Sequence, residues 1–268
     1  MYFNQFRQII ILLFLVTLHT TLLAESKTYT VPLNLNYTSE IHSEDVYQGC
    51  PRVDCIPSID NPKFISPASA TWLKETDLVF VFSYNNQHQV YPRRLLDWHE
   101  IVNDQIDDLY FAISYCPLCG SAVAFERKVN GKVAEFGVSG KLHNSDLLMY
   151  DRNEGNLWQQ ITGKAVSGPA GKRGEKLRIL PLQTVIWKNW KEAHPKSKVL
   201  SMETGYARQY AVYPYGDYET ERSLYFPVKH IDSRLHPKTV VIGISYNNKQ
   251  KAYPLSILKN KGKISDQI

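Results

Sequence analysis

Two cysteines separated by two residues, Cys116 and Cys119, stand in the segment SYCPLCGS. Their sulfurs converge on one point if Gly120 takes a positive φ and turns backbone N–H groups toward them. Such a turn suits a soft or borderline metal ion, copper or zinc. The same spacing suits the reactive disulfide of a thiol–disulfide oxidoreductase, or a structural staple in a non-catalytic extracellular interaction module. These three uses imply three different classes of protein.

The residues that follow the turn favour the metal. A reactive disulfide usually places its first cysteine at a helix N-terminus, which lowers the thiol pKa. Here the following SAVAFERKV alternates like a strand. Two thiolates are only half of a metal site, and the histidines His99 and His143 are the candidates for the remainder. Met149 lies in an alternating segment and is expected in the core.

The first two dozen residues are typical of an export signal. Arg7 is followed by the apolar run IIILLFLV, which is too short to cross a bilayer comfortably, and Ala24 offers a cleavage position. We therefore predict a signal peptide over residues 1–24, or an N-terminal anchor if this segment is not cleaved. The protein is then exported, periplasmic or extracellular, and contacts a membrane only through an uncleaved N-terminal segment.

Export bears on the cysteines and on the metal. The chain has four cysteines, too few for a disulfide scaffold, and they form two close pairs. In an exported protein we expect Cys50 and Cys55 to form a disulfide that closes a short loop, rather than to supply the missing half of the metal site. A Cys/His site in that compartment makes copper the first choice and zinc the second, because copper binds most such ligands more tightly.

Net charge and known motifs exclude several functions. The net charge is +5, but the Lys and Arg residues are scattered and form no basic stripe, so nucleic acid is not an expected partner. No phosphate-binding glycine loop, nucleophile elbow or His-Glu-x-x-His helix is present. The expected partner is a small molecule or a metal-handling protein, and no reaction can be assigned.

The remaining pattern predicts a β-rich α+β fold with mostly antiparallel strands and a few short helices. Residues 25–60 are polar and rich in turn residues and predict an irregular N-terminal arm, followed by a single β-rich domain over residues 61–268. Asn130-Gly131 predicts a hairpin. Helices are predicted over Arg94–Asn103 and from an N-cap at Thr184 to the residues before Pro195.

Two segments also resemble each other. Residues 77–106 and 239–268 align without gaps at an offset of 162, including the shared words SYNN, YP and DQI. This predicts an internal repeat of two strand–turn–strand–helix units. Polar residues gather in NSDLLMYDR and NLWQQITGKAVSGP. They either line a cleft or, for Asp151 and Arg152, form an ion pair that caps a hairpin; the cleft residues would be Asp146, Asp151, Arg152, Gln159 and Gln160.

An ordered set of motifs resembles the bacterial and archaeal domain-of-unknown-function family numbered 3179. The set runs from DCIPSIDNPKF through YPRRLLDWHEIVND, SYCPLCGSAVAFER, SGKLHNSDLLMYDR, LWQQITGKAVSGP and HPKSKVLS to the late AYPLSIL. The resemblance implies an exported or membrane-tethered protein with no reaction attached. Members of that family tend to continue past the second Asp-x-Ile, whereas this sequence ends at Ile268, so the resemblance implies a second unit that is truncated there.

The family motifs map onto a set of candidate site residues. On the predicted helix, His99 would share a face with Asn103, and Glu100 with Asp104. The resemblance ranks His99 above His143 as a ligand, since relatives often carry another residue at position 143. Geometry ranks them the other way, because the Asn130-Gly131 hairpin returns His143 to the level of the cysteines. The residues expected to line the pocket are Glu100, Asn103, Asp104, Asn144, Asp146, Asp151, Arg152, Trp158 and Gln160.

Overall fold

The computed structural model describes residues 31–247, 249–261 and 263–266, and the predicted signal over residues 1–24 lies outside them. Strands dominate, helices are short, and among the named strands of the described residues only β4 and β15 pair in parallel, while an isolated bridge joins Ile59 and Val102 in parallel. The expected β-rich α+β fold with mostly antiparallel strands is confirmed. The helical elements are a 3-10 turn (Ser43–Asp45), α1 (Arg93–His99), α2 (Gly168–Lys172), α3 (Trp187–Ala193) and α4 (Leu255–Lys261).

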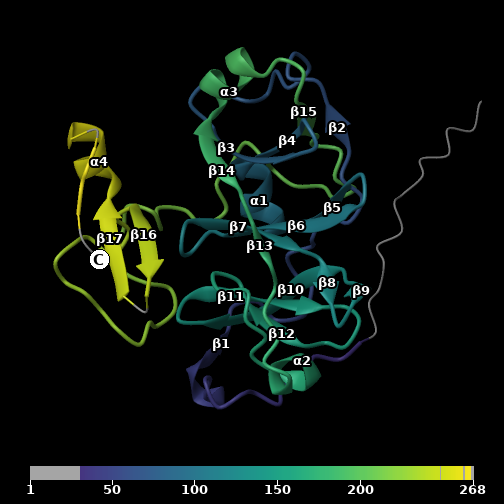
Figure 1. Ribbon diagram of the computed structural model, residues 1–268, viewed down its shortest axis with the longest axis vertical. Coiled ribbons are helices and arrows are strands. Elements are labelled where there is room, and N and C mark those ends of the chain that lie inside the picture. Colours follow the sequence, from purple (N-terminus) through teal and green to yellow (C-terminus); the bar gives the residue numbers. More distant parts are fainter. Residues whose placement is uncertain (1–30, 248, 262, 267–268) are drawn as a thin grey trace, which may run out of the picture.

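Three sheets follow one another along the long axis of the body (Figure 1). The first has the order β14-β3-β4-β15-β2 and the second, which carries the cysteine turn, has the order β13-β7-β6-β5. Their strands are β2 (Phe64–Ile65), β3 (Leu78–Tyr84), β4 (Gln87–Pro92), β14 (Gln183–Ile186) and β15 (Lys198–Leu200), then β5 (Ile101–Ile106), β6 (Leu109–Cys116), β7 (Ser121–Glu126) and β13 (Ile179–Leu180).

The third sheet has the order β1-β10-β11-β12 and supplies the other half of the site. A two-stranded hairpin, β8–β9, turns at Asn130 and Gly131, which both take positive φ, so the predicted hairpin is confirmed. The strands are β1 (Val46–Gln48), β8 (Lys128–Val129), β9 (Lys132–Val133), β10 (Phe136–His143), β11 (Asp146–Asp151) and β12 (Leu157–Gln159).

Clusters of apolar side chains join neighbouring sheets. Between the first and second sheets, the rings of Phe82 and Phe111 stack with their centroids 4.1 Å apart. Each such buried ring contributes about 1.5–3 kcal/mol through the area that it removes from water. Between the second and third sheets, Phe125 packs with Met149 and Trp158, and Met149 is fully buried as expected. The cysteine turn therefore starts from strands that are held on both faces.

The two predicted helices need correction. The first ends at His99, because Glu100 takes a φ of +57° and the β-branched Ile101 and Val102 continue as β5, paired with β6. Asn103 and Asp104 are therefore strand residues and do not share helical faces with His99 and Glu100. The second helix begins at Trp187, since Thr184 lies in β14 opposite Phe80. In both places strand pairing overrides the local helical pattern.

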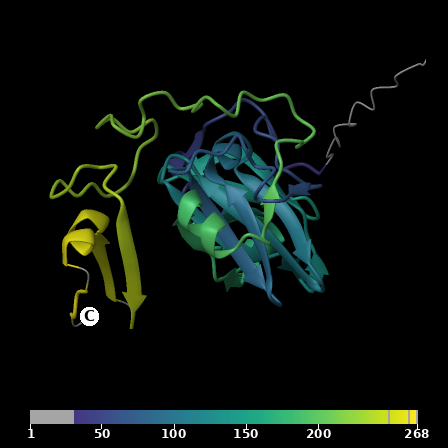
Figure 2. The same cartoon turned by 90° about the horizontal axis from the view of Figure 1, so that it is seen from above.

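The C-terminal segment forms β16 (Val241–Tyr246), β17 (Lys249–Pro254) and α4, and it stands apart from the body in both views (Figures 1 and 2). Its register is that of β3 and β4 shifted by the sequence offset: Val79 faces Pro92, and Val241 faces Pro254. The surroundings differ, because Val79 is fully buried whereas Val241 is 40% exposed. The internal repeat of the two units stays a prediction, as does the division of the chain at residue 60.

No helix among the described residues has the length and apolar character that crossing a bilayer requires.

Candidate metal centre

Cys116 and Cys119 lie at the two sides of a tight turn between β6 and β7. Cys116 is the last residue of β6 and faces Ser121, the first residue of β7. Gly120 has a φ of +59°, the left-handed conformation expected from the sequence. Gln160 holds both ends of the turn: its amide nitrogen donates to the Ser114 hydroxyl at 3.1 Å, and its amide oxygen accepts from the Ser121 hydroxyl at 3.2 Å. The two hydrogen bonds of Gln160 therefore hold the turn that carries the two sulfurs in place.

The turn between β10 and β11 brings a carboxylate to these sulfurs. Asn144 and Ser145 both take positive φ, as a two-residue hairpin turn requires, and Asp146 then begins β11. Asp146 Oδ1 lies 3.2 Å from Cys119 Sγ. One ligand atom from each of Cys116, Cys119 and Asp146 lies within 4.8 Å of the others, a group that can hold a metal ion. The Ser145 carbonyl oxygen also lies close to the cysteines, at 3.8 Å from each of the two sulfurs.

The centre gathers groups that become negative on deprotonation. Burial raises the pKa of Asp146, although hydrogen bonds from Gln159 and the Ile161 N–H oppose this shift. Contact with Cys116, followed by burial, raises the pKa of the Cys119 thiol. Asp146 forms no ion pair within the described part of the chain. Placing three such groups together is costly unless protons or a cation accompany them.

A chain of side chains orients Asp146. Gln159 Nε2 and the Ile161 N–H both donate to Asp146 Oδ2, and this leaves Oδ1 toward Cys119. His143 Nδ1 lies 3.0 Å from Gln159 Oε1 and so acts on the carboxylate only through Gln159. In metal sites, residues that do not bind the metal themselves orient the ligands through hydrogen bonds of this kind. His143 is therefore near the centre, as its hairpin suggested, but it does not belong to the group of three ligand atoms.

His99 is placed in a different environment. Its ring is fully buried, with Nδ1 2.7 Å from the Pro57 carbonyl oxygen and Nε2 2.7 Å from the Tyr210 hydroxyl. Burial lowers the pKa of His99 to about 4. Because both ring nitrogens already have partners, the structure does not bring this histidine into the cysteine centre.

Most of the other predicted pocket residues belong to separate networks. The Asn103 side chain donates a hydrogen bond to the Phe136 carbonyl oxygen and accepts one from the Phe136 N–H. Asp104 accepts a hydrogen bond from the Tyr91 hydroxyl at 2.5 Å, and Asn144 accepts one from the Lys229 N–H at 2.8 Å. Asp151 and Arg152 have different partners, which does not support the ion pair between them that was one alternative. Asp151 accepts from Trp158 at 2.8 Å and Asn156 at 2.7 Å, whereas Arg152 pairs with Asp60 at 2.7 Å.

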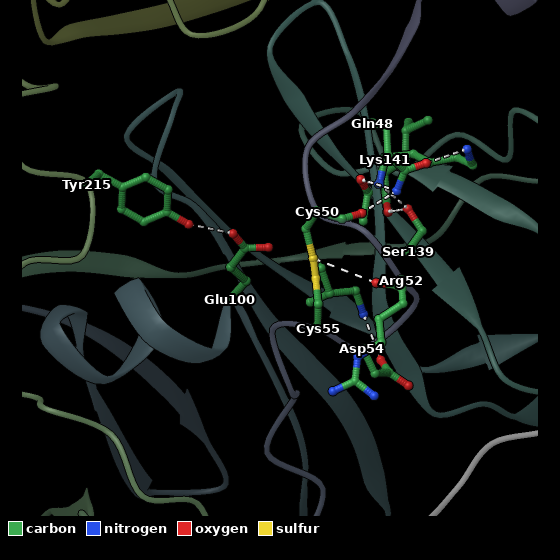
Figure 3. The surroundings of a disulfide bond; sticks show 12 residues. Gln48, Cys50, Arg52, Asp54, Cys55, Glu100, Ser139, Lys141 and Tyr215 are labelled. Carbon is green, nitrogen blue, oxygen red and sulfur yellow. Dashed lines mark hydrogen bonds between the residues drawn. A yellow bond between two sulfur atoms is a disulfide. The ribbon is translucent and has the colours of Figure 1, made fainter.

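Glu100 lines a cavity of about 330 Å³ together with Cys116 and Cys50. The Tyr215 hydroxyl donates to Glu100 Oε1 at 2.9 Å, and burial raises the pKa of Glu100 to about 7. Figure 3 shows this pair beside the Cys50–Cys55 disulfide, which forms as the sequence analysis expected. Sequence reasoning missed Tyr215 altogether, since a lone tyrosine in a tyrosine-rich loop carries no spacing signal.

The fold and the site define a β-rich α+β protein with a dithiol–carboxylate centre. A family model described as "Protein of unknown function (DUF3179)" matches residues 53–268, and the chain belongs to this family. No curated protein and no solved structure matches the chain.

Proposed function

We propose that this protein is an extracytoplasmic zinc-binding protein whose ligands are Cys116, Cys119 and Asp146. The observation that carries the proposal is the convergence of their three ligand atoms, from the β6–β7 turn and the start of β11, within 4.8 Å of one another. Two of the three residues are almost completely buried, Cys116 at 1% and Asp146 at 4% exposure. Cys116 and Asp146 are therefore not surface side chains that happen to meet in solvent.

A bound divalent cation resolves the electrostatics of the centre. Two thiolates and a carboxylate carry three negative charges when deprotonated, and the cation replaces the protons that they otherwise retain. Three protein ligands leave the fourth tetrahedral position of zinc for water or a substrate, as in sites that act on a bound molecule. The chain of Gln159 and His143 behind Asp146 supplies the outer contacts that such ligands have.

The ligand set favours zinc over copper, the first choice from the sequence. Reduced copper prefers sulfur and imidazole ligands, whereas zinc also accepts a carboxylate oxygen. With Asp146 in the position expected for a histidine, the centre offers two sulfurs and an oxygen. Export is supported by the N-terminal sequence, Arg7 followed by an apolar run, and by the Cys50–Cys55 disulfide in its short loop.

Zinc titration of reduced, metal-free protein tests the proposal. We expect one zinc ion per chain for the wild type and, for Asp146→Asn, an affinity lower by about 100-fold, because an amide is a weaker ligand than a carboxylate. The asparagine can keep its oxygen toward the Gln159 and Ile161 donors, which favours retention of the fold. Asp108→Asn, a substitution at a surface carboxylate that contacts Tyr84, is the matched control. Equal affinities for both variants, or copper binding that zinc cannot displace, would contradict a zinc site.

A thiol–disulfide oxidoreductase is the second candidate. The two sulfurs are 2.7 Å apart, and Asp146, a buried carboxyl with a raised pKa, contacts Cys119 and can accept or return its proton. In this reaction the two thiols pass two electrons to a disulfide of a partner protein and become a disulfide themselves. A reduction potential in the range of thioredoxin or above, about −270 mV or higher, would favour this candidate over a structural staple.

A further inference from the structure

The cavity beside the cysteine turn is lined by several separate parts of the chain. The disulfide loop contributes Gly49 and Cys50, the cysteine turn contributes Pro117 and Leu118, and a distant loop contributes Tyr225 and Phe226. Its volume of about 330 Å³ is at the lower end of small-molecule sites. The third sheet supplies aliphatic walls from Val138, Leu142 and Leu147.

One carboxyl group stands among these apolar walls. Glu100 is 6% exposed, and within the described chain the Tyr215 hydroxyl donates to it whereas no ion pair involves it. In Figure 3 one carboxylate oxygen faces Tyr215 and the other is directed toward the side of the disulfide. Lys141 also lines the cavity, but its ammonium group donates to Gln48 Oε1 at 2.9 Å. The ammonium group of Lys141 is therefore engaged with Gln48, and among the described residues no cation forms an ion pair with Glu100.

Aromatic rings surround the same space. Tyr215, Tyr225 and Phe226 line the cavity with Glu100, and the negative faces of aromatic rings attract organic cations. A carboxylate, several rings and aliphatic walls together are the features by which proteins recognise an organic ammonium ion.

We propose that this cavity binds a small organic amine, with its ammonium group at Glu100 and its apolar part between Leu118, Val138 and Phe226. The site goes beyond the proposed zinc centre and does not require it, because Glu100 and the aromatic rings are not among the metal ligands. The cavity reaches Cys116, so an occupant lies next to the cysteine turn.

Benzylamine and benzyl alcohol, which have the same shape but differ in charge, are suitable probes. Calorimetric titration of metal-free and zinc-loaded wild-type protein should show benzylamine bound at least about tenfold more tightly than benzyl alcohol in both forms. Glu100→Gln should remove this preference. Glu126→Gln, at a glutamate paired with Arg178 on β7, should leave it unchanged.

Phe226→Ala is the second variant, since its half-buried loop position can change without disturbing the core. It should weaken both probes by about fivefold or more, because it removes an apolar wall that they share. Equal binding of the two probes would show a neutral apolar site, and binding of neither would show no site; either result overturns the proposal. Failure of zinc binding with retained benzylamine preference would refute the metal centre and leave the amine site standing.

Discussion

The two cysteine pairs of this protein are close in sequence spacing but differ in what their sulfurs face. Cys50 and Cys55 are bonded to each other, and the nearest further contact of Cys50 Sγ is the Arg52 carbonyl oxygen at 3.6 Å. Cys116 and Cys119 are free and face Asp146 and the Ser145 carbonyl. The sulfurs of the first pair are bonded to each other. The sulfurs of the second pair lie beside oxygen atoms, and this arrangement is stabilised when a proton or a metal cation lies between sulfur and oxygen. Spacing alone does not separate these roles, but the surrounding oxygens do.

The largest expected effect comes from substituting one cysteine of each pair. Cys119→Ser should lower zinc affinity by about 1,000-fold, since one of the two thiolates is lost. Cys55→Ser should leave zinc affinity within about twofold, because the disulfide lies outside the group of ligands. Competition with a chromophoric chelator measures both. If the two variants bind zinc equally well, the distinction between the pairs is wrong.

Glu100, in the cavity that both pairs border, should make stability depend on pH. Burial raises its pKa from 4.5 to about 7, so the folded state keeps a proton that the unfolded chain has lost. The stabilisation is complete below about pH 4.5 and is lost as pH rises to about 7, a change of about 3 kcal/mol in the free energy of unfolding.

Urea unfolding between pH 4 and 8 measures this slope. Asp97 and Asp104, whose pKa values burial raises to about 7 and about 6, give slopes of the same sign. Glu100→Gln should therefore flatten the wild-type curve without removing all of its slope. Parallel curves for the wild type and the variant would mean that Glu100 is charged in the folded protein.

Removal of the disulfide should reduce stability without affecting the metal. Closure of the short loop from Cys50 to Cys55 contributes about 2 kcal/mol in the chain-entropy model. The double variant Cys50→Ser/Cys55→Ser should lose about this amount in urea unfolding of metal-free protein. A change below about 0.5 kcal/mol would indicate that contacts with the body already order the loop.

The smallest expected effect concerns the residues behind Asp146. Gln159→Leu should reduce zinc affinity by about tenfold, because the carboxylate loses the donor that orients it. His143→Phe should cost no more than this, since His143 contacts Gln159 and not a ligand atom. A loss for His143→Phe as large as that for Cys119→Ser would show that the histidine binds the metal directly, as the sequence analysis expected.

Local turn chemistry made part of this structure predictable. Asn130-Gly131, the glycine after Cys119 and the close Cys50/Cys55 pair each indicate their conformation from a few adjacent residues. The matching registers of β3–β4 and β16–β17 likewise follow from two similar segments.

The remaining features depend on contacts between distant segments. The first helix was extended too far because Ile101 and Val102 pair with a strand that begins at Leu109. Asp146 was expected in a pocket, but its position at the sulfurs depends on packing between the second and third sheets. The loop that brings Tyr215 to Glu100 lies more than a hundred positions further along the chain. Such contacts leave no periodic or local signal in one sequence.

X-ray absorption at the zinc edge of the reduced protein, loaded with one equivalent of zinc, tests the central claim most directly. The account predicts two sulfur neighbours at about 2.3 Å and two oxygen neighbours at about 2.0–2.2 Å, one from Asp146 and one from water. Asp146→Asn should alter the oxygen shell and keep both sulfurs. A coordination shell without sulfur, or with more than two sulfurs, would contradict the assignment of Cys116, Cys119 and Asp146 as the metal centre.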